Sequence, residues 1–373
     1  MKKGYLYCYM ILVMALLGGF GLHSLFSSVD IYSENENRYL DEYPSFSLVG
    51  MSDRTFQNDF SSAFSDQFTG RDMWMQVSTQ LKKLAGFQDI SQVYMGKDGY
   101  YFSKTTQDKI EQRQYLKNLR YVEYMGETAD SKTSLILAPS PGTVLKDKLP
   151  EDAPYYDGDA MVQMAEAVMK KARFIDTRQT LREYAKQNQV YFRTDHHWTA
   201  LGAYAAYSAY CVGNKLEQHT YGYFDVKRIS DSFLGSMYSK VLDPGVKKDD
   251  LYAAANVPQA EVVCDGEKKQ GIYDVEQLMK KDKYAYFFGG NYGEVHIKSH
   301  GSTEKKLLVL KDSYANSFVP YLMGDFGEIT MIDLRYYKQS VQELLQREKY
   351  DNVLILYEMS NFAQDTNLYK LVH

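Results

Sequence analysis

The chain has 373 residues, and its 48 acidic and 43 basic side chains give a formal net charge of −5. This slightly acidic balance gives no reason to expect a nucleic-acid partner, and 45% hydrophobic residues are typical of a globular protein with a sizeable core. The length allows one large domain or two ordinary ones. Tyrosine is unusually frequent at 34 residues, which suits either ordinary packing or a sugar-binding surface.

The first predicted element is a membrane helix at residues 5–26. This run contains no formally charged side chain, and as a helix it spans about 33 Å, close to the thickness of a hydrocarbon core. Lys2 and Lys3 precede it, so residues 1–4 are expected to form a cytoplasmic stub and the rest of the chain to lie outside the cell membrane. The long apolar run without a clear cleavage site favours an uncleaved anchor over a cleaved signal peptide.

The rest of the chain divides into a linker and a large extracellular domain. Residues 27–52 are polar, contain one proline and predict a juxtamembrane linker. Residues 53–373 alternate helix and strand signals, beginning with helical spacing over residues 72–86. Residues 219–270 carry scattered charges in loop-like sequence and predict an insertion or lid within this domain.

Short apolar runs, most of them separated by helical segments, predict the strands of the extracellular domain. Near-continuous apolar strands that alternate with helices are typical of an α/β fold with a mostly parallel sheet and helices on both faces. In such sheets, functional groups collect at the carboxyl ends of the strands. The expected strands lie within residues 134–142, 173–177, 189–192, 284–290, 306–313, 328–333 and 352–360.

Ser313 follows one of these strands and precedes a predicted helix. A serine at a strand-to-helix turn presents its hydroxyl at the edge of the sheet, and its backbone amide can stabilise a developing oxyanion. This position suits a nucleophile. The alternative is that Ser313 is a helix N-cap, a position that serine favours for structural reasons alone.

Asp195 and His197 can supply the base that a serine nucleophile needs. In an extended segment residues two apart point to the same side, so both could face one cleft while His196 faces away. The carboxylate would then bond one ring nitrogen of His197 and leave the other to take the Ser313 proton. General-base assistance of this kind is worth roughly 10²–10⁴ in rate.

Metal binding and structural polar packing are the other uses of the Asp-His-His cluster. Adjacent histidines in an extended segment point apart, and the remaining histidines offer no H-x-x-x-H spacing, so no metal site is predicted. Three cysteines are too few for a zinc cluster, and Cys8 lies in the predicted anchor. Cys211 and Cys264 are either two buried thiols or one disulfide.

The motif "TDHHWT", followed by a small-residue helix and later by "KDS" after an apolar strand, resembles the DHHW proteins. These are relatives of the alginate O-acetyltransferases and, more distantly, of the SGNH hydrolases. The segments "ENRYLDEYP", "DQFTGRDMW", "GKDGYYF" and "LILAPSPGTVL" recur there in similar order. The resemblance therefore covers roughly residues 36–361, about one SGNH-like domain.

The resemblance implies a Ser-His-Asp triad in an SGNH-like sheet, with Ser313 as nucleophile, His197 as base and Asp195 as the acid that orients it. His196 stands at a variable position between the paired residues and is a candidate substrate contact. The Ser313 backbone amide is the expected oxyanion donor, and Gly290 and Asn291 are further candidates or only a turn. Lys311 departs from the pattern, because SGNH enzymes usually have glycine there.

Proteins similar to this one move acetyl groups onto or off the hydroxyls of extracellular polysaccharides. The resemblance thus implies a membrane-anchored O-acetyltransferase with an acetyl-serine intermediate, without a bound cofactor. Acetyl-CoA is absent outside the cell, so a multi-pass membrane O-acyltransferase partner would export the acetyl group. The alternatives are a polysaccharide acetylesterase with the same triad and a non-catalytic glycan-binding assembly protein.

Overall fold

The computed structural model describes residues 2–300 and 303–372, and the chain divides into two compact units. The first unit takes in the residues up to Ile90 together with Ser239–Gly245. The second takes in Ser91–Tyr238 and the residues from Val246 onward. Residues 53–90, which the sequence placed at the start of the extracellular domain, thus lie in the first unit.

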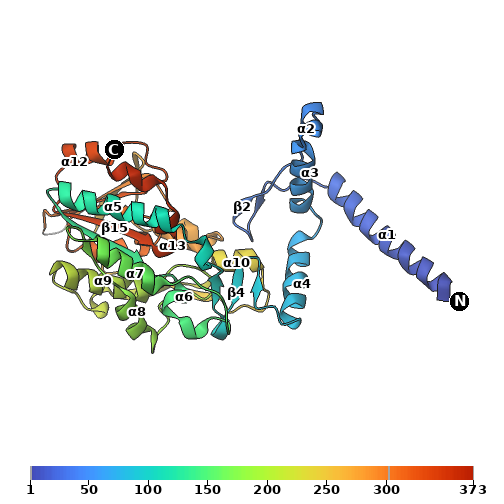
Figure 1. Ribbon diagram of the computed structural model, residues 1–373, viewed down its shortest axis with the longest axis horizontal. Coiled ribbons are helices and arrows are strands. Elements are labelled where there is room, and N and C mark those ends of the chain that lie inside the picture. Colours follow the sequence, from blue (N-terminus) through green and yellow to red (C-terminus); the bar gives the residue numbers. More distant parts are fainter. Residues whose placement is uncertain (1, 301–302, 373) are drawn as a thin grey trace. The chain divides into compact units, whose positions relative to one another are not determined.

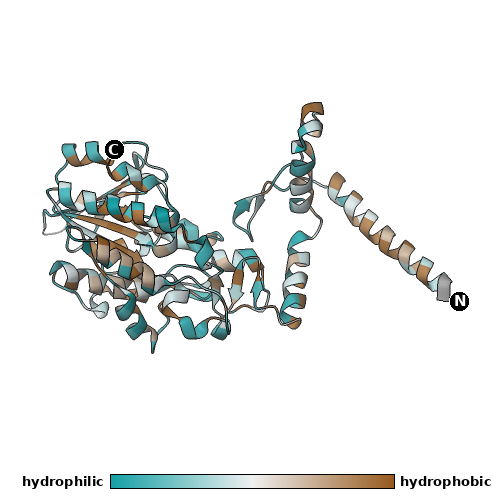
Figure 2. Cartoon of the chain, viewed as in Figure 1, coloured by the Kyte–Doolittle hydropathy of each residue, from teal (hydrophilic) through white to brown (hydrophobic). Residues whose placement is uncertain are grey.

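The first unit begins with an apolar helix, α1, at Lys2–Phe26 (Figure 1). Its segment Gly4–Phe26 is long and apolar enough to cross a membrane, and hydrophobic residues run along it in Figure 2. These features fit a membrane anchor and equally a signal sequence. The remaining elements are β1 at Tyr32–Ser33, β2 at Arg38–Tyr39, α2 at Leu48–Asp53, α3 at Thr55–Asp66, α4 at Arg71–Leu84 and β3 at Asp89–Ile90.

Ion pairs fasten the β1–β2 hairpin to the junction of α3 and α4. The Arg38 guanidinium donates to both carboxylate oxygens of Asp66, at 2.5 and 2.8 Å, and its Nε lies 2.6 Å from Glu36. Arg71 completes the cluster by pairing with Glu36. The side chains of Glu36 and Asp66 are buried, so these pairs are shielded from solvent screening. The predicted linker therefore contains folded structure.

The second unit is built on an eight-stranded sheet in the order β11-β10-β12-β14-β13-β15-β6-β7. From β14 to β7 neighbouring strands are parallel, whereas β11, β10, β12 and β14 pair antiparallel. The bounds are β6 Lys132–Ala138, β7 Arg173–Phe174, β10 Ala260–Cys264, β11 Glu267–Lys269, β12 Glu294–Ser299, β13 Lys306–Lys311, β14 Glu328–Ile332 and β15 Asn352–Glu358.

Helices cover both faces of this sheet. Along β13, Leu307 and Val309 belong to one buried cluster and Leu308 and Leu310 to another, because successive side chains of a strand point to opposite faces. Helices α9 and α11 pack in the first cluster, and α5, α7, α12 and α13 in the second. The helices are α5 Gln112–Thr128, α6 Pro141–Val144, α7 Gly158–Val168, α8 Arg178–Ala185, α9 Ala200–Asn214, α10 Ser236–Val241, α11 Ala315–Phe318, α12 Val341–Arg347 and α13 Met359–Gln364.

The prediction of a mostly parallel sheet is wrong, because the sheet is mixed. The antiparallel strands were missed since they lie toward one edge: β12, for example, alternates buried and more exposed residues instead of forming a continuous apolar run. Within the predicted insertion at residues 219–270, β8 (Val226–Phe233) and β9 (Asp249–Ala254) form a separate hairpin, but β10 belongs to the main sheet. A short hairpin also joins β4 (Val93–Met95) to β5 (Tyr101–Ser103).

Two of the expected strands have other structures. Residues 189–192 form no regular strand and contribute only an isolated bridge between Tyr191 and Trp198. Residues 284–290 begin in a 3₁₀ turn at Lys283–Tyr286 and continue into a glycine turn. In both segments the apolar residues are buried because they fill the core beside the sheet. Cys211 and Cys264 are two separate buried thiols.

Candidate active site

Ser313 lies directly beyond the carboxyl end of β13, in the turn that leads to α11. The buried side chain of Asp312 fixes this turn: it accepts hydrogen bonds from the backbone N–H of Tyr314 at 3.0 Å and of Glu358 at 2.8 Å. Residue Tyr314, and not Ser313, occupies the N-cap of α11. The Ser313 hydroxyl therefore does not serve as a helix cap, and its side chain is partly open to solvent.

The loop that carries Asp195 and His197 is held in place from both ends. Before the motif, the buried Asp249 carboxylate accepts hydrogen bonds from the backbone and hydroxyl of Thr194, at 2.9 and 2.7 Å. After it, the indole N–H of Trp198 donates to the Ser317 hydroxyl and to the Tyr314 carbonyl. Trp198 thus packs in the core and ties the loop to the helix that follows Ser313.

His197 bridges Asp195 and Ser313. Its Nδ1 lies 2.6 Å from Asp195 Oδ1, and its Nε2 lies 2.7 Å from the Ser313 hydroxyl oxygen. A charged carboxylate can only accept, so the ring hydrogen belongs on Nδ1 and Nε2 is left to accept the serine proton. The Tyr284 ring stacks on the imidazole at 3.9 Å, and its hydroxyl donates to the Ser313 carbonyl. The structure thus brings together the three side chains that the sequence selected.

The surroundings of Asp195 keep its carboxylate charged. Burial raises its pKa, but the charges of His196 and His197, the hydrogen bond from His197 and the backbone N–H of Ser236 outweigh that effect. The pKa of Asp195 therefore lies well below its ordinary value. The Ser236 hydroxyl adds a further donor at 2.8 Å. A carboxylate that stays charged stabilises the imidazolium that forms when His197 takes a proton.

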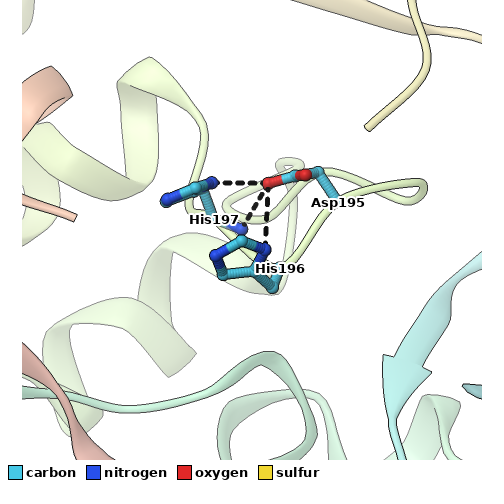
Figure 3. A group of neighbouring side chains, drawn as sticks. All are labelled: Asp195, His196 and His197. Carbon is cyan, nitrogen blue, oxygen red and sulfur yellow. Dashed lines mark hydrogen bonds and ion pairs between the residues drawn. The ribbon is translucent and has the colours of Figure 1, made fainter. Parts of the chain in front are cut away.

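His196 does not face away from the cluster, which corrects the sequence-based expectation. The loop bends at this point instead of running extended, so the rings of His196 and His197 lie 3.9 Å apart (Figure 3). The Nδ1 of His196 lies 2.7 Å from the Ser236 hydroxyl. Ligand atoms of Asp195, His196 and His197 all lie within 4.8 Å of one another, close enough to bind a metal ion. Both ring nitrogens of His197, however, already pair with Asp195 and Ser313.

The two further oxyanion candidates sit in a turn with unusual backbone geometry. Phe288, Gly289 and Gly290 all have positive φ, and for Phe288 this conformation is strained. The side-chain oxygen of Asn291 accepts hydrogen bonds from Lys311 at 3.3 Å and from Asn316 at 3.2 Å. Both donors lie within three positions of Ser313 in the sequence.

Lys311, the departure from the SGNH pattern, is a buried cation. Its ammonium donates to the Asn316 side-chain oxygen at 2.7 Å, which leaves the Asn316 amide nitrogen to donate to Asn291. Burial lowers the pKa of Lys311 to about 8. These bonds occupy the Asn291 oxygen, which leaves its amide nitrogen as the group with hydrogens to donate. Gly290 stands next to Asn291 in the same turn.

Sequence reasoning missed several residues that shape this site. Ser236 donates to Asp195 from outside the motif, and Gly235 lies so close that a Cβ there would overlap the Asp195 carboxylate. Asp249 and Tyr284 were also missed. No local pattern marked these residues, because each acts through a contact between distant segments; Tyr284 was read as part of a strand.

Comparison with known proteins adds independent information. The DHHW protein family model matches residues 160–332, and a model described as an SGNH hydrolase-like domain, acetyltransferase AlgX, matches residues 93–224. No curated protein matches the chain.

Solved structures extend the likeness over most of the chain. A DHHW family protein from Eubacterium siraeum matches with a TM-score of 0.63 at 20% identity, over 76% of this chain and 96% of that one. Bacillus cereus PatB1 with a sulfonyl adduct matches with a TM-score of 0.60 at 23% identity, over 74% and 96%. At these identities the structural likeness establishes the fold alone.

Proposed function

The chain belongs to the DHHW family, as its motifs predicted, and we propose that it is an O-acetyltransferase that modifies hydroxyls of a cell-wall or secreted polysaccharide. The observation that carries this proposal is the position of His197, within hydrogen-bond distance of both Asp195 and Ser313. A serine hydroxyl needs such a base to become a nucleophile at neutral pH.

The proposed reaction proceeds in two acyl transfers. In the first, Ser313 Oγ attacks the carbonyl carbon of an acetyl donor while His197 Nε2 takes the hydroxyl proton. The donor's leaving group departs with that proton, and an acetyl ester remains on Ser313. In the second, His197 deprotonates a sugar hydroxyl, whose oxygen attacks the acetyl carbon. The proton returns to Ser313, and the acetylated sugar leaves.

Negative charge develops on the acetyl oxygen in both steps and needs hydrogen-bond donors. The Ser313 backbone N–H has no hydrogen-bond acceptor among residues 2–300 and 303–372, so it is available for this role. The Asn291 amide nitrogen is the second proposed donor, with Gly290 shaping its turn. His196 lies beside His197 and is a candidate contact for the sugar. Removing one oxyanion donor typically costs about 10²–10³ in kcat.

The nature of the relatives supports acetyl transfer. One matching family model is described as an acetyltransferase, and PatB1 is a structural relative that has been solved with a sulfonyl adduct. An activated hydroxyl attacks the sulfur of a sulfonyl reagent and displaces its leaving group, so the same chemistry is a suitable probe of Ser313. The polysaccharide acceptor is carried over from the resemblance of the motifs to the alginate O-acetyltransferases.

The proposed location is outside the cell, with α1 as an uncleaved anchor. Its length and composition support this topology. An extracellular domain has no access to acetyl-CoA, so the acetyl group would come from an exported donor. A multi-pass membrane O-acyltransferase is the proposed partner that supplies it, and the enzyme itself would need no cofactor.

The direct test supplies the purified full chain with a small acetyl ester, with and without an oligosaccharide acceptor. Acetylated sugar that depends on Ser313 supports transfer. Free acetate alone, formed equally with and without sugar, would show an acetylesterase. The informative variant is Ser313→Ala, and the matched control is Ser65→Ala, at an exposed serine on α3. If neither product forms although the protein binds glycan, the third alternative, a non-catalytic assembly protein, takes its place.

A further inference from the structure

Helix α4 in the first unit has one face that is held by hydrogen bonds and another that is apolar and exposed. On the first face, the Thr79 hydroxyl donates to the Val241 carbonyl, and Gln80 and Lys83 donate to the Asp243 carboxylate at 2.7 and 2.6 Å. These contacts lie inside the first unit, which includes Ser239–Gly245. They fix the rotation of α4 about its own axis.

The other face of α4 is apolar and exposed. Trp74, Val77, Leu81 and Leu84 repeat at intervals of three and four residues, so they form one stripe along the helix. Their exposed fractions are 43, 42, 61 and 84%, which is unusual for four large apolar side chains in a row. We call this set the α4 stripe. Something other than water is expected to cover it.

The α4 stripe begins where α4 meets the apolar helix α1. The Trp74 ring packs edge-on against Phe20 of α1, with ring centroids 5.8 Å apart. Phe68, just before α4, also stacks on Phe20, at 6.4 Å. Hydrogen bonds from Thr69 to His23 and Ser24 hold the same junction against the last turns of α1. The exposed apolar surface of α1 therefore continues directly into the α4 stripe.

This continuity decides what covers the stripe. Phe20 lies six residues before the end of α1, about 9 Å along the helix axis. If α1 spans the membrane as proposed, Phe20 lies about 9 Å below the outer end of the spanning segment, within the outer acyl chains, and its partner Trp74 lies at a similar depth. The apolar face of an interfacial helix reaches about 5–10 Å into this region. Tryptophan is the residue that membrane interfaces favour, and an amphipathic helix with an apolar stripe and polar opposite face suits that position.

A second copy of the chain is the competing occupant. The stripe has coiled-coil spacing, but α4 has only 14 residues. Four side chains cannot bury the roughly 1,200 Å² of a stable interface between proteins. The membrane needs no such area, because α1 already holds α4 at the surface.

We propose that α4 docks on the outer leaflet of the membrane, with the α4 stripe in the acyl-chain boundary and the Thr79 face turned toward the protein. This inference rests on the proposed anchoring by α1. It adds a second membrane contact to the single spanning helix, and the two contacts together fix the orientation of the first unit at the membrane.

The protein's two tryptophans allow a direct test. The full chain is reconstituted into phosphatidylcholine vesicles in which the acyl chains carry bromine near the glycerol end, and tryptophan emission is compared with that in unbrominated vesicles. Trp198 is fully buried in the second unit, so the quenchable emission reports Trp74. The Trp74→Phe variant measures the Trp198 background.

The expected result is loss of most Trp74 emission in brominated vesicles, with protection from iodide in the water. Leu81→Gln is expected to restore much of that emission, whereas the adjacent control Lys82→Gln, off the stripe, leaves the quenching unchanged. Trp74 emission that is unaffected by bromine and quenched by iodide would overturn the proposal. Protection from both quenchers, dependent on protein concentration, would also overturn it and would identify a second copy as the occupant.

Washing the vesicles with alkaline carbonate separates this proposal from the anchoring on which it rests. If the chain stays in the membrane and Trp74 is not quenched, only the docking of α4 fails. If the chain washes off, anchoring and docking fail together. Acetyl transfer by the same preparation is measured independently, so neither outcome decides the proposed chemistry.

Discussion

Two buried carboxylates in the second unit, Asp195 and Glu358, have the same exposure and opposite electrostatics. Their exposed fractions are 3 and 4%. Asp195 receives donors on both oxygens, from His197 and Ser236, and its pKa falls well below the ordinary value. Glu358, at the end of β15, receives donors on Oε2 only, and Oε1 has no partner within residues 2–300 and 303–372.

The difference shows that the neighbouring charges and hydrogen-bond donors, and not the depth of burial, decide which buried acid is charged. For Glu358, burial raises the pKa to about 7; hydrogen bonds from Ser360 and Asn361 oppose the rise, and the nearby charge of Asp312 adds to it. Asp195 is thus prepared to stabilise a cation on His197, whereas Glu358 is about half protonated at neutral pH.

Asp195→Asn is expected to have the largest effect. The amide can donate to His197, which favours the tautomer with its hydrogen on Nε2 and removes the acceptor for the Ser313 proton. The expected loss in kcat is about 10³–10⁴-fold, measured with an acetyl ester at neutral pH. Glu358→Gln is the matched control, and it should retain activity within a few fold. Equal losses of kcat in the two variants would contradict the claim that only Asp195 supports His197.

Glu358→Gln should instead change how stability depends on pH. A raised folded-state pKa contributes stability that is fully present below the unfolded-state value of 4.5 and is lost as pH rises through about 7. The full difference is about 3 kcal/mol, because one pKa unit corresponds to about 1.4 kcal/mol. The measurement is the free energy of unfolding in urea at pH 5 and pH 8. The variant should gain stability relative to wild type at pH 8. If the difference in the free energy of unfolding between variant and wild type is the same at pH 5 and pH 8, Glu358 does not have a raised pKa.

Gly235→Ala tests how tightly the surroundings of Asp195 are built. The new Cβ would overlap the Asp195 carboxylate and push it out of line with His197. A displacement of about 1 Å in such an arrangement can cost 10²-fold in rate. In Gly271→Ala the added Cβ has open space, so this control should keep full activity. The measurement is kcat in the two variants. If Gly235→Ala is as active as the control, the close approach of Gly235 does not position Asp195.

Ser236→Ala is expected to have the smallest effect. It removes the hydroxyl donor to Asp195 but keeps the backbone donor at 2.7 Å. A hydrogen bond to a charged group is worth about 1.5–3 kcal/mol, and the remaining donors compensate in part, so about a 10-fold loss in kcat is expected. Ser232→Ala is the control, since that hydroxyl pairs with Ser230. Activity equal to the control would mean that the backbone donors alone hold Asp195.

The sequence predicted the parts of the fold that depend on continuous apolar runs. The buried strands β6, β13, β14 and β15 all lie where such runs were found, because a central strand is covered on both faces. Strands β10 and β12, which lie toward one edge of the sheet, carry polar residues in alternation and were missed. Segment 284–290 was misread because its aromatic residues pack beside the sheet, and hydropathy does not distinguish that position from a strand.

The candidate site was predictable to the same degree. Spacing placed Asp195 and His197 on one side of their segment, and a strand-to-helix signal selected Ser313. The orientation of His196 was predicted wrongly, because it depends on a bend that follows from contacts with Ser236 and Tyr314. Long-range contacts of this kind leave no periodic trace in a single sequence.

The most direct test of the account is the site of covalent reaction. The full chain is treated briefly with phenylmethanesulfonyl fluoride or an activated acetyl ester, digested, and mapped by mass spectrometry in wild type and in Asp195→Asn. We expect an adduct on Ser313 that forms quickly in wild type and far more slowly in the variant. An adduct at another residue, or equal rates on Ser313 in both proteins, would contradict the claim that His197, oriented by Asp195, activates this serine.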